Sequence, residues 1–252
     1  MSFDVAAESY GRFMGRYSEP LAAEFVRLAD PQPGQRVLDV GCGPGAVSAR
    51  LVERLGAPAV CAIDPSAPFV AATRERLPGV DVRQGTAEAL PWADDAFDQA
   101  LAQLVVHFMT DPVAALREMA RVTRPGGLVA ASVWDYAGAR SPLSVFWTAV
   151  RELDPEHPGE AELAGARPGH LAELFHAAGL REIAAGELTV RVRVGGFDDW
   201  WQPYALGVGP AGTYLAAQDD AARKQLRARC AARLPAGPFE MSATAWVVRA
   251  RA

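Results

Sequence analysis

The sequence predicts an α/β fold built on a doubly wound, mostly parallel β-sheet. Short apolar runs of strand length alternate along the first half of the chain with segments whose apolar residues recur every three to four positions. Such alternation requires crossover connections, which give parallel strands with helices on both faces of the sheet. The chain has 252 residues, 50% of them hydrophobic, which is enough for one sizeable core. We therefore expect a single domain.

The first expected helix covers residues 18–29, with Ser18 as its N-cap and Pro20 near its first turn. Asp111 and Pro112 give a similar start to a later helix, as a cap and a first helical residue. The other elements expected before residue 135 are strands over 36–40, 59–64, 80–85, 97–104 and 126–134, with helices over 46–56, 66–78 and 111–123.

Beyond residue 140 the order is less regular. A helix is expected over 168–180, a half-exposed strand over 188–194, where apolar residues alternate with arginines, and a final strand over 243–250. The segment 195–240 is too long for a hairpin turn, so we expect it to form a helical cap. The whole pattern gives a Rossmann-like, seven-stranded sheet whose last strand runs antiparallel, with the cap inserted before that strand.

Charge and hydropathy exclude several kinds of partner. The formal net charge is −5, and Lys224 is the only lysine, so a nucleic-acid partner is not expected. No apolar run approaches the roughly 18 residues of a membrane span. The start of the sequence carries Asp4 and Glu8 and lacks the basic and apolar regions of a secretory signal.

The three cysteines, Cys42, Cys61 and Cys230, lie far apart and form no CxxC motif. Neither a disulfide framework nor a zinc site is expected from them. We expect a cytoplasmic protein that holds no metal. We expect it to be either a monomer or a homodimer.

The segment "VLDVGCGPGA", residues 37–46, is the first that indicates a chemistry. Gly41, Gly43 and Gly45 follow an apolar strand and precede a helix, which is how a sheet of this class binds a ligand at the carboxyl end of a strand. The spacing fits the dinucleotide of a redox enzyme and the nucleoside of a methyl donor equally well. Asp64, which ends the second strand, would bind ribose hydroxyls in either case.

Four motifs together distinguish these readings. "LDVGCGPG", "CAIDPS", "GTAEALPWADDAFDQAL" and "RVTRPGG" occur in the order and spacing of one family. With them, residues 10–135 resemble the class I S-adenosylmethionine-dependent methyltransferases, in particular the small-molecule group that includes the ubiquinone-biosynthesis type.

The resemblance implies a donor site for S-adenosylmethionine, released as S-adenosylhomocysteine. Asp39 and the glycine turn would hold the methionine part, Asp64 the ribose, and Phe69 the adenine. Thr86 stands where the family often has Asp, so the backbone N–H of Ala87 is left to meet the adenine edge. The implied donor-binding residues are Tyr17, Arg16, Asp39, Gly41, Cys42, Gly43, Gly45, Asp64, Pro65, Phe69, Thr86, Ala87 and Gln103.

Three of these assignments rest on position alone. Gln103 follows the fourth strand and would lie near the amino acid end of the donor. Relatives place a helical lid over residues 1–33, so Tyr17 would close over the donor and Arg16 would meet its carboxylate. The expected divisions of the chain are this lid, a donor-binding core over 34–135, the rest of the sheet and its helices over 136–194 and 241–252, and the cap over 195–240.

The acceptor site is less well defined by sequence. His107 follows the fourth strand and is the candidate general base, although a structural histidine satisfied by a neighbouring group is the favoured interpretation. Aromatic residues would form the walls of an apolar acceptor pocket beneath the cap. The candidates are Trp134, Tyr136, Trp200, Trp201 and Tyr204.

Three functions remain in competition. The favoured one is a methyltransferase that acts on oxygen, nitrogen or carbon of a small molecule. The alternatives are an NAD-dependent oxidoreductase, although no Y-x-x-x-K motif is present, and a protein that binds S-adenosylmethionine without catalysis.

Overall fold

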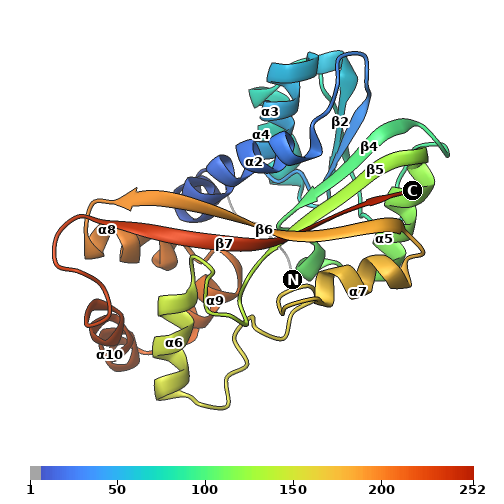
Figure 1. The fold of residues 1–252 in the computed structure, drawn as a ribbon. Helices are drawn as coiled ribbons and strands as arrows, with labels where there is room; N and C mark the ends of the chain where they lie inside the picture. Colours follow the sequence, from blue (N-terminus) through green and yellow to red (C-terminus); the bar gives the residue numbers. More distant parts are fainter. Residues whose placement is uncertain (1–6) are drawn as a thin grey trace.

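A computed structural model describes residues 7–252 (Figure 1). The first six residues of the expected N-terminal lid, Asp4 among them, lie outside this range. One seven-stranded sheet has the strand order β3-β2-β1-β4-β5-β7-β6. Its strands are β1 (Val37–Val40), β2 (Val60–Asp64), β3 (Asp81–Gln84), β4 (Phe97–Gln103), β5 (Thr123–Trp134), β6 (Arg181–Val194) and β7 (Phe239–Arg251).

The pairing confirms the predicted fold class. Neighbouring strands from β3 to β5 pair in parallel, and β7 pairs antiparallel with both β5 and β6. The sheet order reverses between β1 and β4, which places a ligand crevice at the carboxyl ends of these strands.

Helices cover both faces of the sheet. The first face packs on α2, α3 and α4, with Phe25 and Leu51 fully buried, and the second packs on α5 and α7, with Leu116 and Phe175 fully buried. In Figure 1 these two groups lie on either side of the sheet. Their bounds are α2 (Arg16–Ala29), α3 (Ala46–Leu55), α4 (Ala67–Arg76), α5 (Pro112–Val122) and α7 (His170–Ala177).

The strands β6 and β7 are long and extend past the rest of the sheet as a two-stranded ribbon (Figure 1). The segment 195–240 connects them and folds under this ribbon together with α6, around an apolar cluster that includes Trp134 and Phe146. The elements here are α6 (Ser144–Leu153), α8 (Phe197–Trp201), the 3-10 helix η4 (Gln202–Leu206), α9 (Gly209–Ala217) and α10 (Asp220–Ala231). Two further 3-10 helices are η2 (Ala57–Ala59) and η3 (Val106–Phe108).

The N-terminal region differs from the prediction. A short helix α1 (Ala7–Tyr10) and a π-helix η1 (Gly11–Gly15) run directly into α2. Ser18 therefore lies inside a continuous helix, only 3% exposed, and is not an N-cap. The reason is that the preceding turn is already helical, so no free N–H groups at this point require a cap.

Two other boundaries also differ. Helix α6 was not expected, and β6 begins seven residues before the predicted strand. The first half of β6 lies at the edge of the sheet with exposed side chains, so it lacks the alternation by which a half-buried strand is recognised. The Asp111 cap is as predicted, because its side chain accepts the N–H of Ala114 at 2.9 Å.

Candidate functional site

The glycine turn is held tightly against the second strand. Gly41, Gly43 and Gly45 all have positive φ, at +70°, +53° and +85°. The backbone N–H groups of Gly41 and Cys42 both donate to the carbonyl oxygen of Ile63. A Cβ on Gly41 would lie 2.4 Å from Cγ2 of Val105, so any side chain there would force the turn and the β4 loop apart.

Asp64 connects this turn to the end of β2. Its Oδ2 accepts the N–H of Gly43 at 2.9 Å, and its Oδ1 accepts the N–H of Ser66, also at 2.9 Å. Burial raises the pKa of Asp64 above its ordinary value, while these two N–H donors act in the opposite direction. A carboxylate has about four lone-pair sites, so two remain for a ligand.

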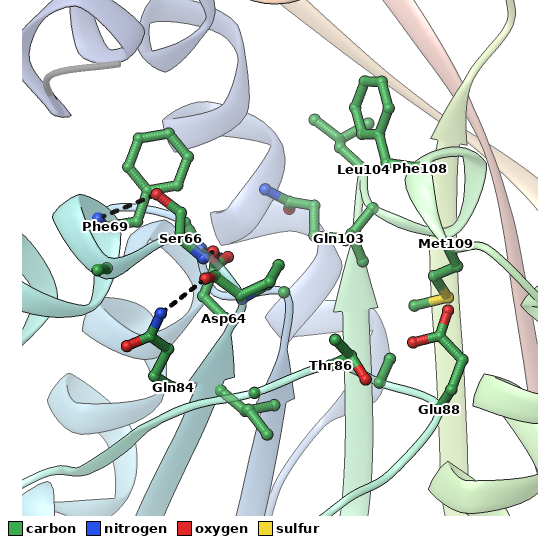
Figure 2. A pocket seen from close by; sticks show the side chains of 18 of the residues that line it. Asp64, Ser66, Phe69, Gln84, Thr86, Glu88, Gln103, Leu104, Phe108 and Met109 are labelled. Carbon is green, nitrogen blue, oxygen red and sulfur yellow. Dashed lines mark hydrogen bonds between the residues drawn. The ribbon is translucent and has the colours of Figure 1, made fainter. Parts of the chain in front are cut away.

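A pocket of about 470 Å³ opens at the carboxyl ends of β1, β2 and β4. This volume lies within the range of ordinary small-molecule sites. In Figure 2, Asp64 and Phe69 lie on one side of the pocket, and Leu104 and Met109 lie on the other. The donor-binding candidates that line it are Gly41, Gly43, Asp64, Pro65, Phe69, Thr86, Ala87 and Gln103.

The polar lining favours a cationic ligand. Asp64 and Glu88 are acidic, and no Lys, Arg or His is among the residues that line this pocket in the described chain. Gln103 donates from Nε2 to the carbonyl of Ser18 at 3.1 Å. Its buried Oε1 has no hydrogen-bond partner within residues 7–252, so it remains available to a ligand that carries N–H groups.

Asp39, Cys42 and Gly45 belong to the glycine segment but do not line the pocket. Asp39 is 1% exposed, and its Oδ2 accepts both the N–H of Ser48, at 2.9 Å, and its hydroxyl, at 2.6 Å. Burial raises the pKa of Asp39 to about 7. Cys42 is buried, and Gly45 begins α3 against Thr73. These residues therefore support the conformation of the turn from the side that faces away from the pocket.

The structure corrects the two N-terminal candidates. Arg16 forms an ion pair with Asp199 of α8, with 3.0 Å between Nη2 and Oδ1. The hydroxyl of Tyr17 lies 3.3 Å from the sulfur of Met241, in the core beneath the cap. Neither lines the pocket.

Tyr10 takes the place in the pocket that Tyr17 was expected to hold. Its ring meets that of Phe69 edge to face, with 5.3 Å between centroids, and it lines the pocket. Glu88 also lines the pocket and was not predicted, although it lies two residues after Thr86 in the quoted "GTAEAL" motif.

The acceptor candidates separate into two groups. His107, Trp134 and Tyr136 line a second, smaller cavity next to the first. Trp201 and Tyr204 line a different cavity under α9 and α10.

Trp200 is buried against Tyr204 in the aromatic cluster of the cap, with 4.8 Å between ring centroids. The three cap aromatics therefore lie away from the cavity that contains His107, because they pack against one another and against α6. The part of the cap that does reach this cavity is the start of α9, residues 208–211.

Within residues 7–252, no three His, Cys, Asp or Glu side chains are grouped as metal ligands. Over the same range, no helix combines the length and the apolar character that crossing a bilayer requires.

Comparison with known proteins agrees with this geometry. A family model described as a methyltransferase domain matches residues 38–131. An uncharacterized methyltransferase of Mycobacterium tuberculosis is 38% identical over 153 residues, which cover 61% of this chain and 57% of that relative. The nocamycin O-methyltransferase of Saccharothrix syringae is 32% identical over 202 residues, covering 73% of this chain and 72% of the relative.

A solved structure extends the likeness to the fold. The phosphoethanolamine N-methyltransferase 2 of Haemonchus contortus, in complex with phosphomonomethylethanolamine and S-adenosylhomocysteine, superposes with a TM-score of 0.60. The sequences are 16% identical, and the superposition covers 97% of this chain and 57% of that one. From the site geometry, the family match and these relatives together, the chain belongs to the class I S-adenosylmethionine-dependent methyltransferases.

Proposed function

We propose that the protein transfers a methyl group from S-adenosylmethionine to oxygen, nitrogen or carbon of a small molecule. The observation that carries this proposal is the charge of the main pocket, which has two carboxylates and no basic side chain in its described lining. S-adenosylmethionine brings a sulfonium and an ammonium group, both positive, whereas a dinucleotide brings a negatively charged pyrophosphate.

The residues of the pocket fit the parts of this donor. Asp64 has lone pairs left for two ribose hydroxyls, and the free Oε1 of Gln103 would accept from the ammonium group. Phe69 and Tyr10 offer aromatic surface to the adenine. The backbone N–H of Ala87 would meet the adenine edge, since Thr86 supplies no carboxylate.

When bound, S-adenosylmethionine supplies a methyl group already activated by a positive sulfur. The protein then has to align the acceptor and exclude water from it. The glycine turn and Asp64 fix one side of the pocket, and the loop after β4, with Leu104 and Phe108, forms the side towards the acceptor.

His107 has a more limited role in this proposal than a general base at neutral pH. Burial lowers the pKa of His107 to about 3, so the imidazole is neutral near pH 7 and a weak proton acceptor. We assign it to the recognition of the acceptor.

The remaining proposals concern the whole protein. A cytoplasmic location is supported by the three buried free cysteines, and a monomer or homodimer stays a proposal. The expected divisions at residues 33, 135, 194 and 240 are retained as proposals, with 195–240 as the cap.

The proposal is tested by measuring S-adenosylhomocysteine production from S-adenosylmethionine with a panel of alcohols, phenols, amines and carboxylic acids. Product that depends on both donor and acceptor supports a methyltransferase. Donor binding without product from any acceptor would favour the non-catalytic alternative, and binding of NAD with no binding of S-adenosylmethionine would favour the oxidoreductase.

A further inference from the structure

A small cavity of about 40 Å³ adjoins the main pocket. Tyr10, Leu104 and Phe108 line both, so the two spaces meet at these side chains. A chemical group in the small cavity would therefore lie next to whatever occupies the main pocket. The inference drawn below rests on the proposed function and identifies the kind of acceptor that this arrangement recognises.

Two buried side chains in the wall of the small cavity lack hydrogen-bond partners. His107 is 6% exposed and Trp134 is 1% exposed. Neither ring nitrogen of His107, nor Nε1 of Trp134, has a partner within residues 7–252. Each such group costs about 1–3 kcal/mol when it is left unpaired away from water. Both residues line the small cavity, so these three buried nitrogens lie beside it, and a polar group that is not part of the chain could pair with them once the wall opens.

A third polar residue of the wall is already satisfied. Glu160 is 2% exposed, and its Oε2 accepts the indole N–H of Trp147 at 2.6 Å. The hydroxyl of Tyr136 is a second hydrogen-bond donor to the same carboxyl group. Burial raises the pKa of Glu160 to about 7. A second carboxylate placed beside this buried acid would lose its own solvation in the same space, and it would meet like charge whenever Glu160 is ionised.

The rest of the wall is apolar. It includes Phe13 and Met14 from the N-terminal helix, Leu143 before α6, and Val208 and Ala211 from the cap. These side chains make apolar contacts with a neutral molecule. They do not compensate a charged molecule for the loss of its hydration.

We propose that the small cavity receives the hydroxyl group of a neutral, largely apolar methyl acceptor, with His107 and Trp134 as its hydrogen-bond partners. A neutral imidazole presents one N–H and one bare nitrogen, and an indole presents only an N–H. One hydroxyl group can accept the indole N–H of Trp134 and donate to the bare ring nitrogen of His107, while the second ring nitrogen points to the other side of the ring, out of its reach. An ammonium group has no lone pair for the indole N–H, and a carboxylate has no proton for the bare nitrogen.

The size of the cavity adds a condition. About 40 Å³ accommodates the hydroxyl end of an acceptor but not its whole body. The π-helix η1 (Gly11–Gly15) and the start of α9 over 208–211 both line the cavity, so they must shift to admit the remainder. Acceptor specificity then depends on the N-terminal helix and the cap together.

The test is a ligand series with one frame: phenol, benzylamine, benzoate and toluene. Each is titrated into the full protein, with and without S-adenosylhomocysteine, and the NMR signal of the Trp134 indole N–H is followed. This signal is assigned by its disappearance in Trp134→Phe. We expect phenol to shift it in a saturable way and to bind at least tenfold more tightly than the other three compounds.

Variants separate hydrogen bonding from shape. Trp134→Phe keeps an aromatic ring without the N–H, and we expect it to weaken phenol binding about fivefold, the equivalent of one hydrogen bond. His107→Gln should weaken phenol binding by a similar factor, as measured by calorimetry. Trp92→Phe, at a buried tryptophan that lines neither the main pocket nor the small cavity, is the matched control and should leave phenol binding unchanged.

Several results would overturn the inference. Toluene binding as tightly as phenol would mean an apolar cavity without polar recognition, and benzoate binding as tightly would contradict the role given to Glu160. An unshifted Trp134 signal at saturating phenol would mean that the unpaired atoms hold only water. Since S-adenosylhomocysteine binding is measured separately, normal binding of it with no selectivity for phenol defeats this inference alone, whereas its failure to bind defeats the proposed function.

Discussion

The Oδ2 atom of Asp64 accepts the backbone N–H of Gly43 at 2.9 Å. This bond joins two segments 21 residues apart in the sequence, the end of β2 and the middle of the glycine turn. One carboxylate thus shapes the turn and, with its remaining lone pairs, faces the pocket. A substitution of Asp64 is therefore expected to change both the conformation of the turn and the affinity of the ligand site.

The first prediction concerns this carboxylate. Asp64→Asn removes the negative charge and replaces one acceptor oxygen by an NH2 group. This NH2 group then faces either the N–H donor of the turn or a ligand hydroxyl, and it cannot accept a hydrogen bond from them. Hydrogen bonds to a charged group contribute about 1.5–3 kcal/mol, so we expect affinity for S-adenosylhomocysteine to fall at least about tenfold. Calorimetric titration measures this effect. Asp220→Asn, on the exposed start of α10, is the matched control, and equal affinity of both variants would contradict the prediction.

The second prediction concerns the close approach at Gly41. In Gly41→Ala the new Cβ would lie 2.4 Å from Val105 at a φ of +70°. Strain and displacement together should lower the free energy of unfolding by about 2 kcal/mol or more and weaken ligand binding. Gly34→Ala has a similar φ, +87°, with nothing within 4 Å, so it should cost only about 1 kcal/mol. Urea denaturation compares the two, and an equal loss in both would remove the steric argument.

The third prediction distinguishes the two tyrosines. Tyr10→Ala removes a ring that lines the pocket and packs on Phe69, so donor affinity should fall several-fold. Tyr17→Phe removes only a contact with the sulfur of Met241, so donor affinity should stay within about twofold of the original protein. Titration with S-adenosylhomocysteine measures both. A larger loss in Tyr17→Phe would restore the role that the resemblance implied for it.

The fourth prediction concerns pH and stability. The pKa of Asp39 is raised by burial from 3.8 to about 7 in the folded protein. Between these values the folded state holds a proton that the unfolded state has lost, so this group stabilises the fold at low pH. That contribution is lost as the pH rises towards 7.

Asp39→Asn cannot titrate, so it should lose less stability than the original protein between pH 5 and pH 8. The expected difference is of the order of 2 kcal/mol. Urea unfolding at the two pH values measures it, and parallel losses in both proteins would show that Asp39 ionises normally in the fold.

The sequence predicts several of the residues that line the main pocket, for a physical reason. Gly41, Gly43 and Asp64 act through the backbone at the ends of two adjacent parallel strands, and strand ends are readable from hydrophobic pattern. Their roles in binding are still proposals, but the structure brings them to one pocket. The doubly wound, mostly parallel sheet also followed from the alternation of strands and helices.

The positions of Tyr10 and Tyr17 could not be predicted in the same way. Both belong to one continuous helical run, but the π-helix at Gly11–Gly15 changes its phase. The resemblance implies Tyr17 from the place of the lid in relatives, which carries no information on this helical phase, whereas the residue that lines the pocket is Tyr10.

Glu160 illustrates the other limit. It lies between α6 and α7, outside any helix or strand and without a periodic pattern, and only tertiary packing buries it against Trp147 and Tyr136. No spacing in the sequence connects it with His107, 53 positions earlier in the chain. The acceptor side of the site is built from such distant segments, and for this reason its aromatic residues were only partly identified.

The most direct test of the central claim is a calorimetric titration of the purified protein with S-adenosylmethionine and, separately, with NAD. Because the described lining of the main pocket carries Asp64 and Glu88 and no basic side chain, we predict micromolar binding of S-adenosylmethionine and no measurable binding of NAD. Binding of NAD without binding of S-adenosylmethionine would contradict the account, since the glycine turn would then hold a dinucleotide.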